Sequence, residues 1–141
     1  MKNLKKQIVL ILGIAILLFS FSQLEAQENK KVEKAGNKFC KSANTFVEAL
    51  IVLDDANATG TYDEFTKAYN KAVKAWNKLE KSAANLEKVE IKESVKAYNK
   101  LVDQVNKIEN DNKTTDAADQ INQHIDSTAD EIASILSGVC K

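Results

Sequence analysis

The stretch FTKAYNKAVKAWNKLEKSAANL, residues 65–86, decides the fold class of this chain. Its apolar side chains recur every three or four residues, which is the spacing of one face of an α-helix. The residues on this seam are Phe65, Tyr69, Ala72, Trp76, Leu79, Ala83 and Leu86. Because only one face is apolar, such a helix must pack against other helices to bury that face. The stretch therefore predicts one member of a helical bundle.

Three further stretches have apolar residues at the same spacing, one before this seam and two after it. Together the four stretches predict helices at about residues 37–56, 62–87, 91–110 and 116–137. Four amphipathic helices of similar length are typical of a bundle in which successive helices run in opposite directions. The chain is therefore expected to be all-α, with an antiparallel up-down-up-down four-helix bundle over residues 37–141.

Local residues indicate where these helices begin and end. Thr61 and Glu64 have the spacing of a capping box, which would open the second helix. Gly138 suits a left-handed position that closes the last helix. Neither Gly nor Pro separates the second and third stretches, so one long helix is an alternative there. That helix would put mostly polar residues on the seam, which favours a break between Leu86 and Ile91.

The N-terminal residues 1–26, MKNLKKQIVLILGIAILLFSFSQLEA, have the layout of a secretory signal peptide. Lysines precede an apolar run that is shorter than the roughly 20 residues of a membrane-spanning helix. Cleavage is expected after Ala26 or, alternatively, after Ser22, and an uncleaved membrane anchor is the remaining alternative. Residues 27–36 are expected to be flexible or frayed. The mature protein is then expected to be secreted or periplasmic, without a stable membrane span.

The two cysteines, Cys40 and Cys140, lie at opposite ends of the predicted bundle sequence. In an antiparallel bundle the start of the first helix and the end of the fourth helix meet at the same end, which would allow the cysteines to pair. Paired cysteines are common in exported proteins. The alternative is a reactive Cys40 thiol, favoured by the adjacent Lys38 and Lys41. A structural disulfide is the expectation, because two cysteines alone cannot form a zinc site.

The charged residues are evenly balanced but unevenly placed. All 20 basic residues are lysines, against 20 acidic residues, and the absence of arginine argues against nucleic-acid binding. One face of the predicted second helix carries Lys67, Lys71, Lys74, Lys78 and Lys81. This face predicts contact with an anionic surface, or else is simply solvated. Asp119, Asp126 and Asp130 share one face of the fourth helix, so the two faces could aid self-association.

Aromatic residues at the seams offer a second hypothesis about function. The set is Phe65, Tyr69, Trp76 and Tyr98. These side chains are expected to form core, or else to line a cavity for a small apolar ligand. The only histidine, His124, has no partner motif for a metal or haem, so no cofactor and no metal are expected. The sequence also has no catalytic triad or phosphate-binding loop, so no enzymatic activity is expected.

Two tripeptides match the N-glycosylation pattern, NAT at Asn57 and NKT at Asn112. Both are expected in loops, and whether they are used depends on the host. Overall, the sequence predicts an exported protein with a non-catalytic binding or structural role, whose partner is a protein or an envelope surface. The alternative is a carrier that holds a small apolar ligand near Trp76 and Tyr98.

Overall fold

The computed structural model describes the backbone of residues 2–86, 89–108 and 115–140, and the side chains of residues 28–86, 89–108 and 116–140. The chain divides into two compact units, Met1–Lys34 and Ala35–Lys141. The predicted signal peptide, residues 1–26, lies outside the residues whose side chains are described. Among the described side chains, none of the helices offers a stretch long and apolar enough to cross a membrane.

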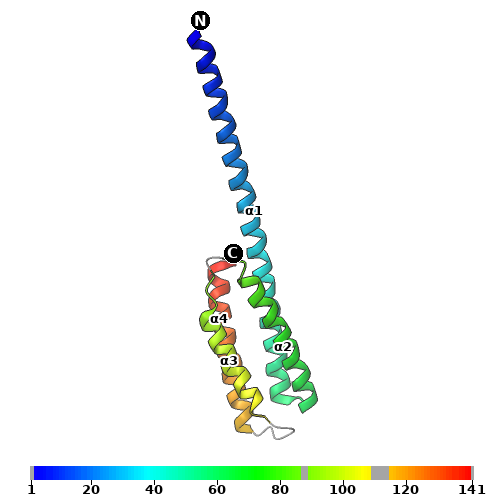
Figure 1. Ribbon diagram of the computed structural model, residues 1–141. Coiled ribbons are helices and arrows are strands. Elements are labelled where there is room, and N and C mark those ends of the chain that lie inside the picture. Colours follow the sequence, from blue (N-terminus) through cyan, green and yellow to red (C-terminus); the bar gives the residue numbers. More distant parts are fainter. Residues whose placement is uncertain (1, 87–88, 109–114, 141) are drawn as a thin grey trace. The chain divides into compact units, whose positions relative to one another are not determined.

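The described part of the chain is helical and contains no strand (Figure 1). Its elements are α1 (Lys2–Thr59), α2 (Tyr62–Ala83), α3 (Lys92–Asn106) and α4 (Thr115–Val139). The predicted all-α class and the break between the second and third helices are confirmed. The N-terminal boundary differs, because α1 is already helical through residues 27–36 and does not begin at Asn37. Those residues contain no Pro, and Gly36 is itself helical and does not adopt the left-handed conformation that would end a helix.

The connection between α1 and α2 is tight, and the predicted capping box forms it. The Glu64 N–H donates to Thr61 Oγ1 over 3.3 Å, and the Thr61 N–H donates to Glu64 Oε2 over 2.8 Å. Gly60 donates its N–H to the Ala56 carbonyl, and a Cβ on Gly60 would lie only 2.6 Å from that oxygen. Glycine is therefore required here for close approach of the backbone.

The predicted end of the last helix is wrong. Gly138 is helical, and α4 continues to Val139, where the Cys140 N–H still donates to the Leu136 carbonyl. Gly138 does not adopt the left-handed conformation expected of a closing glycine. Because Cys140 is fixed to α1 by its disulfide, the helix end is held without a glycine cap.

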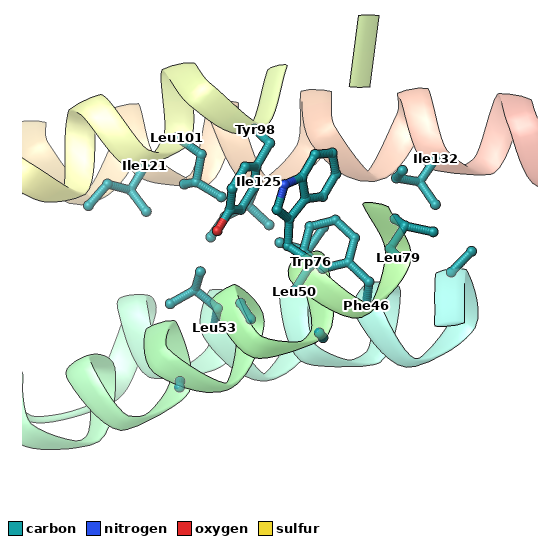
Figure 2. Packing of buried hydrophobic residues seen from close by; sticks show 14 of the residues in the cluster. Phe46, Leu50, Leu53, Trp76, Leu79, Tyr98, Leu101, Ile121, Ile125 and Ile132 are labelled. Atoms are coloured by element: carbon teal, nitrogen blue, oxygen red, sulfur yellow. The ribbon is translucent and has the colours of Figure 1, made fainter. Parts of the chain in front are cut away.

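The core lies in the unit Ala35–Lys141 and takes residues from all four helices. Its largest fully buried side chains are Phe39, Phe46, Leu50, Leu53, Phe65, Leu79, Leu101, Ile121 and Ile132. Figure 2 shows that Phe46, Trp76 and Tyr98, from three different helices, meet at the centre. The repeating spacing of these residues in each helix is what turns them to one common core.

Contacts at two levels join α1 to α4. Cys40 is disulfide-bonded to Cys140 near the C-terminal end of α4. Further along α1, the Asn57 amide donates to the Ala118 carbonyl over 2.8 Å and to Asn122 Oδ1 in the first turns of α4. Cys40 of α1 is thus bonded to the residue that follows α4, whereas Asn57, near the end of α1, contacts the beginning of α4. α3 and α4 also pack along one another.

Candidate interaction surface

The two cysteines lie where the sequence predicted a bridge. Their Cα atoms are 5.8 Å apart, which is a usual separation for a disulfide, and they close 100 residues of chain. Among the described residues no cysteine remains free. The bond removes the alternative of a reactive Cys40 thiol in this state, and it is the chemistry of an oxidising compartment.

The five lysines predicted on one face of α2 form an exposed row, hereafter the lysine stripe. The stripe consists of Lys67, Lys71, Lys74, Lys78 and Lys81, all exposed. Lys67 pairs with Asp63 over 2.6 Å, and this hydrogen-bonded pair raises the pKa of Lys67. Among the described side chains, the other four have no carboxylate within salt-bridge distance. An exposed pair contributes little free energy, so the whole stripe remains available to an anion.

A groove between α1 and α2 adjoins the stripe. Its volume is about 490 Å³, and Lys67 and Lys71 belong to both the groove and the stripe. Val52, Ala56 and Ala68 also line the groove, as do the acidic residues Asp55 and Glu64. The groove therefore combines apolar surface with charges of both signs, whereas the lysine stripe beyond it is basic.

Negative charge is found on α4 and on the neighbouring Asp54 of α1. Burial, followed by repulsion from Asp126 of α4 and then from Asp55, raises the pKa of Asp54. Asp119, Asp126 and Asp130 are exposed on α4, and this set is hereafter the aspartate stripe. α4 contains no lysine or arginine that could neutralise it. The carboxylate of Asp54 is therefore repelled by that of Asp126 across the two helices.

The aromatic residues proposed to line a ligand cavity contact each other directly. The rings of Trp76 and Tyr98 are stacked with their centroids 4.3 Å apart, and the ring centroids of Phe46 and Trp76 are 5.1 Å apart. Figure 2 shows the three rings together. Burial raises the pKa of Tyr98, with smaller effects from Tyr69 and Glu80. Phe65 is also buried, whereas Tyr69 is half-buried. The structure thus places all four in or against the core.

The predicted glycosylation sites and the only histidine were the remaining polar candidates. Asn57 was expected in a loop, but it lies within α1 with its side chain only 2% exposed, so the folded protein does not present it for glycosylation. Asn112 lies outside the described residues. His124 is half-buried on α4. Within the described side chains, no three His, Cys, Asp or Glu residues are grouped as a metal site requires.

Sequence reasoning missed two features of this surface. Ile51 and Val52 are exposed on α1, 57% and 48% respectively, although both are large and apolar. Asp126 of α4 adds to the effect of burial in raising the pKa of Asp54 of α1. The first could have been found, because Ile51 and Val52 fall outside the apolar stripe of Phe46, Leu50 and Leu53. The second depends on which helices become neighbours.

Comparison with known proteins adds no relative. The chain matches no protein family, no curated protein and no solved structure. What the fold and the surface define is a class: an all-helical chain with a buried aromatic centre and one disulfide between distant residues.

Proposed function

We propose that this protein is an exported, non-catalytic binding module that contacts an anionic envelope surface through the lysine stripe of α2. The observation that carries the proposal is the row of five exposed lysines, of which only Lys67 has a carboxylate partner among the described residues. Lysine heads at the end of flexible stems are suited to a diffuse anionic surface and less suited to a single shaped ligand.

The architecture proposed for this module is an antiparallel up-down-up-down four-helix bundle over Ala35–Lys141. Two contacts support it: Cys40 meets Cys140, and Asn57 meets Asn122, so that α1 and α4 are traversed in opposite order. The two-residue connection between α1 and α2 supports an antiparallel pair there as well. A disulfide across such a bundle is consistent with a secreted or periplasmic location.

The test is sedimentation of the protein with vesicles of phosphatidylcholine, with and without added phosphatidylglycerol. Binding should require the anionic lipid and weaken with salt. The variant Lys71→Gln/Lys74→Gln/Lys78→Gln should bind on the order of a hundredfold more weakly, because each lysine near an anionic membrane contributes about 1 kcal/mol.

The matched control removes the same number of exposed lysines from α3 and the following turn, as Lys92→Gln/Lys100→Gln/Lys107→Gln. It should retain most of the binding if the contact is specific to α2. Equal losses in both variants would mean that only net charge matters. Absence of binding to anionic vesicles by the unaltered protein would refute the proposal.

The alternative of an apolar-ligand carrier is the weaker candidate. Phe46, Trp76 and Tyr98 contact one another where the ligand would have to lie. A carrier would therefore have to separate the stacked rings of Trp76 and Tyr98. A saturable change of Trp76 fluorescence on addition of a fatty acid would favour the carrier over the surface-binding module.

A further inference from the structure

The last two turns of α4, residues 133–139, carry no buried side chain, and they are hereafter the α4 tail. Ile132, directly before the tail, is the last residue of α4 in the buried core. Within the tail, Ile135 and Leu136 are half-buried against the core, whereas the apolar Val139 is 38% exposed. Few buried apolar contacts mean that a segment opens at low cost in free energy. The α4 tail therefore gains little stability from packing.

The sequence of the α4 tail, ASILSGV, also favours a helix only weakly. Two serines, one glycine and two β-branched residues occupy five of its seven positions, and all have lower helix propensity than Ala or Leu. Gly138 is helical, and a Cβ there would meet nothing within 4 Å, so no neighbouring side chain packs around it. The last turn of α4 has no basic residue to oppose the partial negative charge at this end of the helix.

The disulfide holds the α4 tail to α1. Cys140 directly follows the tail, and its N–H donates to the Leu136 carbonyl. Cys40 lies within α1, directly after the fully buried Phe39. The hydrogen bonds of Asn57 join α1 to the beginning of α4, at the opposite end of that helix. A covalent bond therefore supplies at the tail what buried side chains supply along the rest of α4.

The disulfide lies at the edge of the fold. Cys40 and Cys140 are both half-buried. Asn37 and Asn44, about one turn before and after Cys40 on α1, are exposed, and so is Ser137 next to Cys140. Disulfides that reagents can reach are the ones that exchange with external thiols, whereas buried ones are inert.

We propose that the Cys40–Cys140 disulfide is a redox switch for the α4 tail. When an external dithiol reduces the bond, the tail detaches from α1 and unfolds locally, while the rest of the unit up to Ile132 stays folded. The released tail presents Ile135 and Leu136 as part of a mobile apolar segment. Reoxidation restores the closed form. The switch lies apart from the lysine stripe and does not depend on the anionic-surface function.

Thiol–disulfide exchange with the dithiol accounts for every atom and electron of the step. The thiolate of the dithiol bonds to one of the two protein sulfurs, the S–S bond breaks, and the other sulfur leaves with the electron pair and takes up a proton. The second thiol of the dithiol then displaces the protein sulfur from the mixed disulfide, and that sulfur also takes up a proton. The dithiol is oxidised to its own disulfide, and Cys40 and Cys140 are reduced to thiols.

The first experiment is hydrogen exchange of the protein with and without dithiothreitol, in the absence of denaturant. After reduction, amides of the α4 tail should exchange at the rate of an unstructured peptide. Amides of α2 and of residues 116–132 should remain protected by at least about tenfold. A tail that stays protected after reduction would overturn the proposal, and so would a loss of protection throughout the unit.

The variant Cys40→Ser/Cys140→Ser is the control for the reductant. Its α4 tail should exchange rapidly whether or not dithiothreitol is present, because the covalent bond is absent in both cases. A change caused by dithiothreitol in this variant would show that the reductant acts elsewhere, and it would overturn the proposal.

Gly138→Ala tests whether weak local helicity is what allows the tail to open. Alanine favours the helix, so the reduced variant should have tail amides that exchange about fivefold more slowly than those of the reduced unaltered protein. Ser127→Ala, at an exposed position of α4 outside the tail, is the matched control and should leave tail exchange unchanged. Equal effects of the two substitutions would contradict separate opening of the tail.

The rate of reduction tests whether the folded protein is the form that reacts. The rate should be proportional to the concentration of dithiothreitol and should change little with urea below the unfolding transition. A rate that rises steeply with urea would mean that reduction follows unfolding of the whole unit, and it would overturn the proposed switch.

Discussion

Asn57 joins α1 to α4 from inside the fold. Its amide is buried and donates hydrogen bonds to the Ala118 carbonyl and to Asn122 Oδ1. A buried amide with partners fixes the level of one helix against the other, because any slip would leave polar groups unpaired in the core. At the scale of single residues, Asn57 links α1 to the beginning of α4 by hydrogen bonds, and Cys40 links α1 to the end of α4 by a disulfide.

The variant Asn57→Ala should lower the free energy of unfolding by about 1–3 kcal/mol, because it leaves buried partners unsatisfied. The measurement is urea denaturation followed by circular dichroism. Asn99→Ala on the exposed side of α3 is the control and should change stability by less than about 0.5 kcal/mol. Equal effects of the two substitutions would contradict the proposed role of Asn57.

Asp54 gives a prediction about pH. Burial and the neighbouring carboxylates of Asp126 and Asp55 raise its pKa, so folding favours its protonated form. A group with a raised pKa contributes its stability below the unfolded pKa and loses that contribution as pH rises through the folded pKa. Asp54→Asn should therefore stabilise the fold at pH 7, by less than about 1 kcal/mol.

The gain from Asp54→Asn should vanish in acid, below the ordinary pKa of 3.8, where the native carboxyl is already protonated. Thermal melts of both proteins at neutral and acid pH measure the difference. Asp103→Asn, exposed on α3, is the control. A gain that is the same at both pH values would show that charge on Asp54 is not its cause.

At the scale of elements, the ends of α2 and α4 are held in different ways. α2 begins with a reciprocal capping box between Thr61 and Glu64, and the Thr61 N–H lowers the pKa of Glu64. α4 ends with a helical glycine at Gly138 and with the disulfide of Cys140. The first end is stabilised by local hydrogen bonds, and the second by a covalent bond to another helix.

The two glycines near helix ends should respond to alanine in opposite ways. Gly138→Ala should stabilise the fold by about 0.5–1 kcal/mol, because the position is helical and its Cβ meets no other atom. Gly60→Ala should destabilise it, because the Cβ would lie 2.6 Å from the Ala56 carbonyl oxygen. Urea denaturation of both variants is the test, and a loss of stability in Gly138→Ala would indicate a left-handed glycine.

At the scale of the whole molecule, one covalent bond closes almost the entire unit Ala35–Lys141. A disulfide between residues 100 apart restricts the unfolded chain strongly, and the chain-entropy model assigns such a loop up to about 4–5 kcal/mol. A domain of this size has a limited core, so a covalent bond of this kind is a large part of its stability.

The variant Cys40→Ser/Cys140→Ser should be about 2–5 kcal/mol less stable than the unaltered protein. Urea denaturation with and without reductant measures the difference. Reductant should destabilise the unaltered protein and leave the variant unchanged. If reduction had no effect on the unaltered protein, the disulfide would not be a determinant of its stability.

The features predicted correctly from sequence are those set within one or two helical turns. The apolar spacing predicted four helices, the drift of the seam after Leu86 predicted the break, and Thr61 with Glu64 predicted the capping box. The pairing of Cys40 with Cys140 followed from the expected direction of the helices. The start at Asn37 and the closing role of Gly138 were not found in the structure, because a continuous helix and a disulfide override weak local signals.

By itself, then, the sequence determined which residues form helices and which face of each helix is apolar, because both depend on short-range spacing along the chain. The tertiary structure alone decided that Asn57 is buried against α4 and that Asp126 of α4 helps to raise the pKa of Asp54 of α1. These features depend on which helices become neighbours and on how far each is shifted along its axis relative to the next. That choice is made by packing of the whole core, which local spacing does not encode.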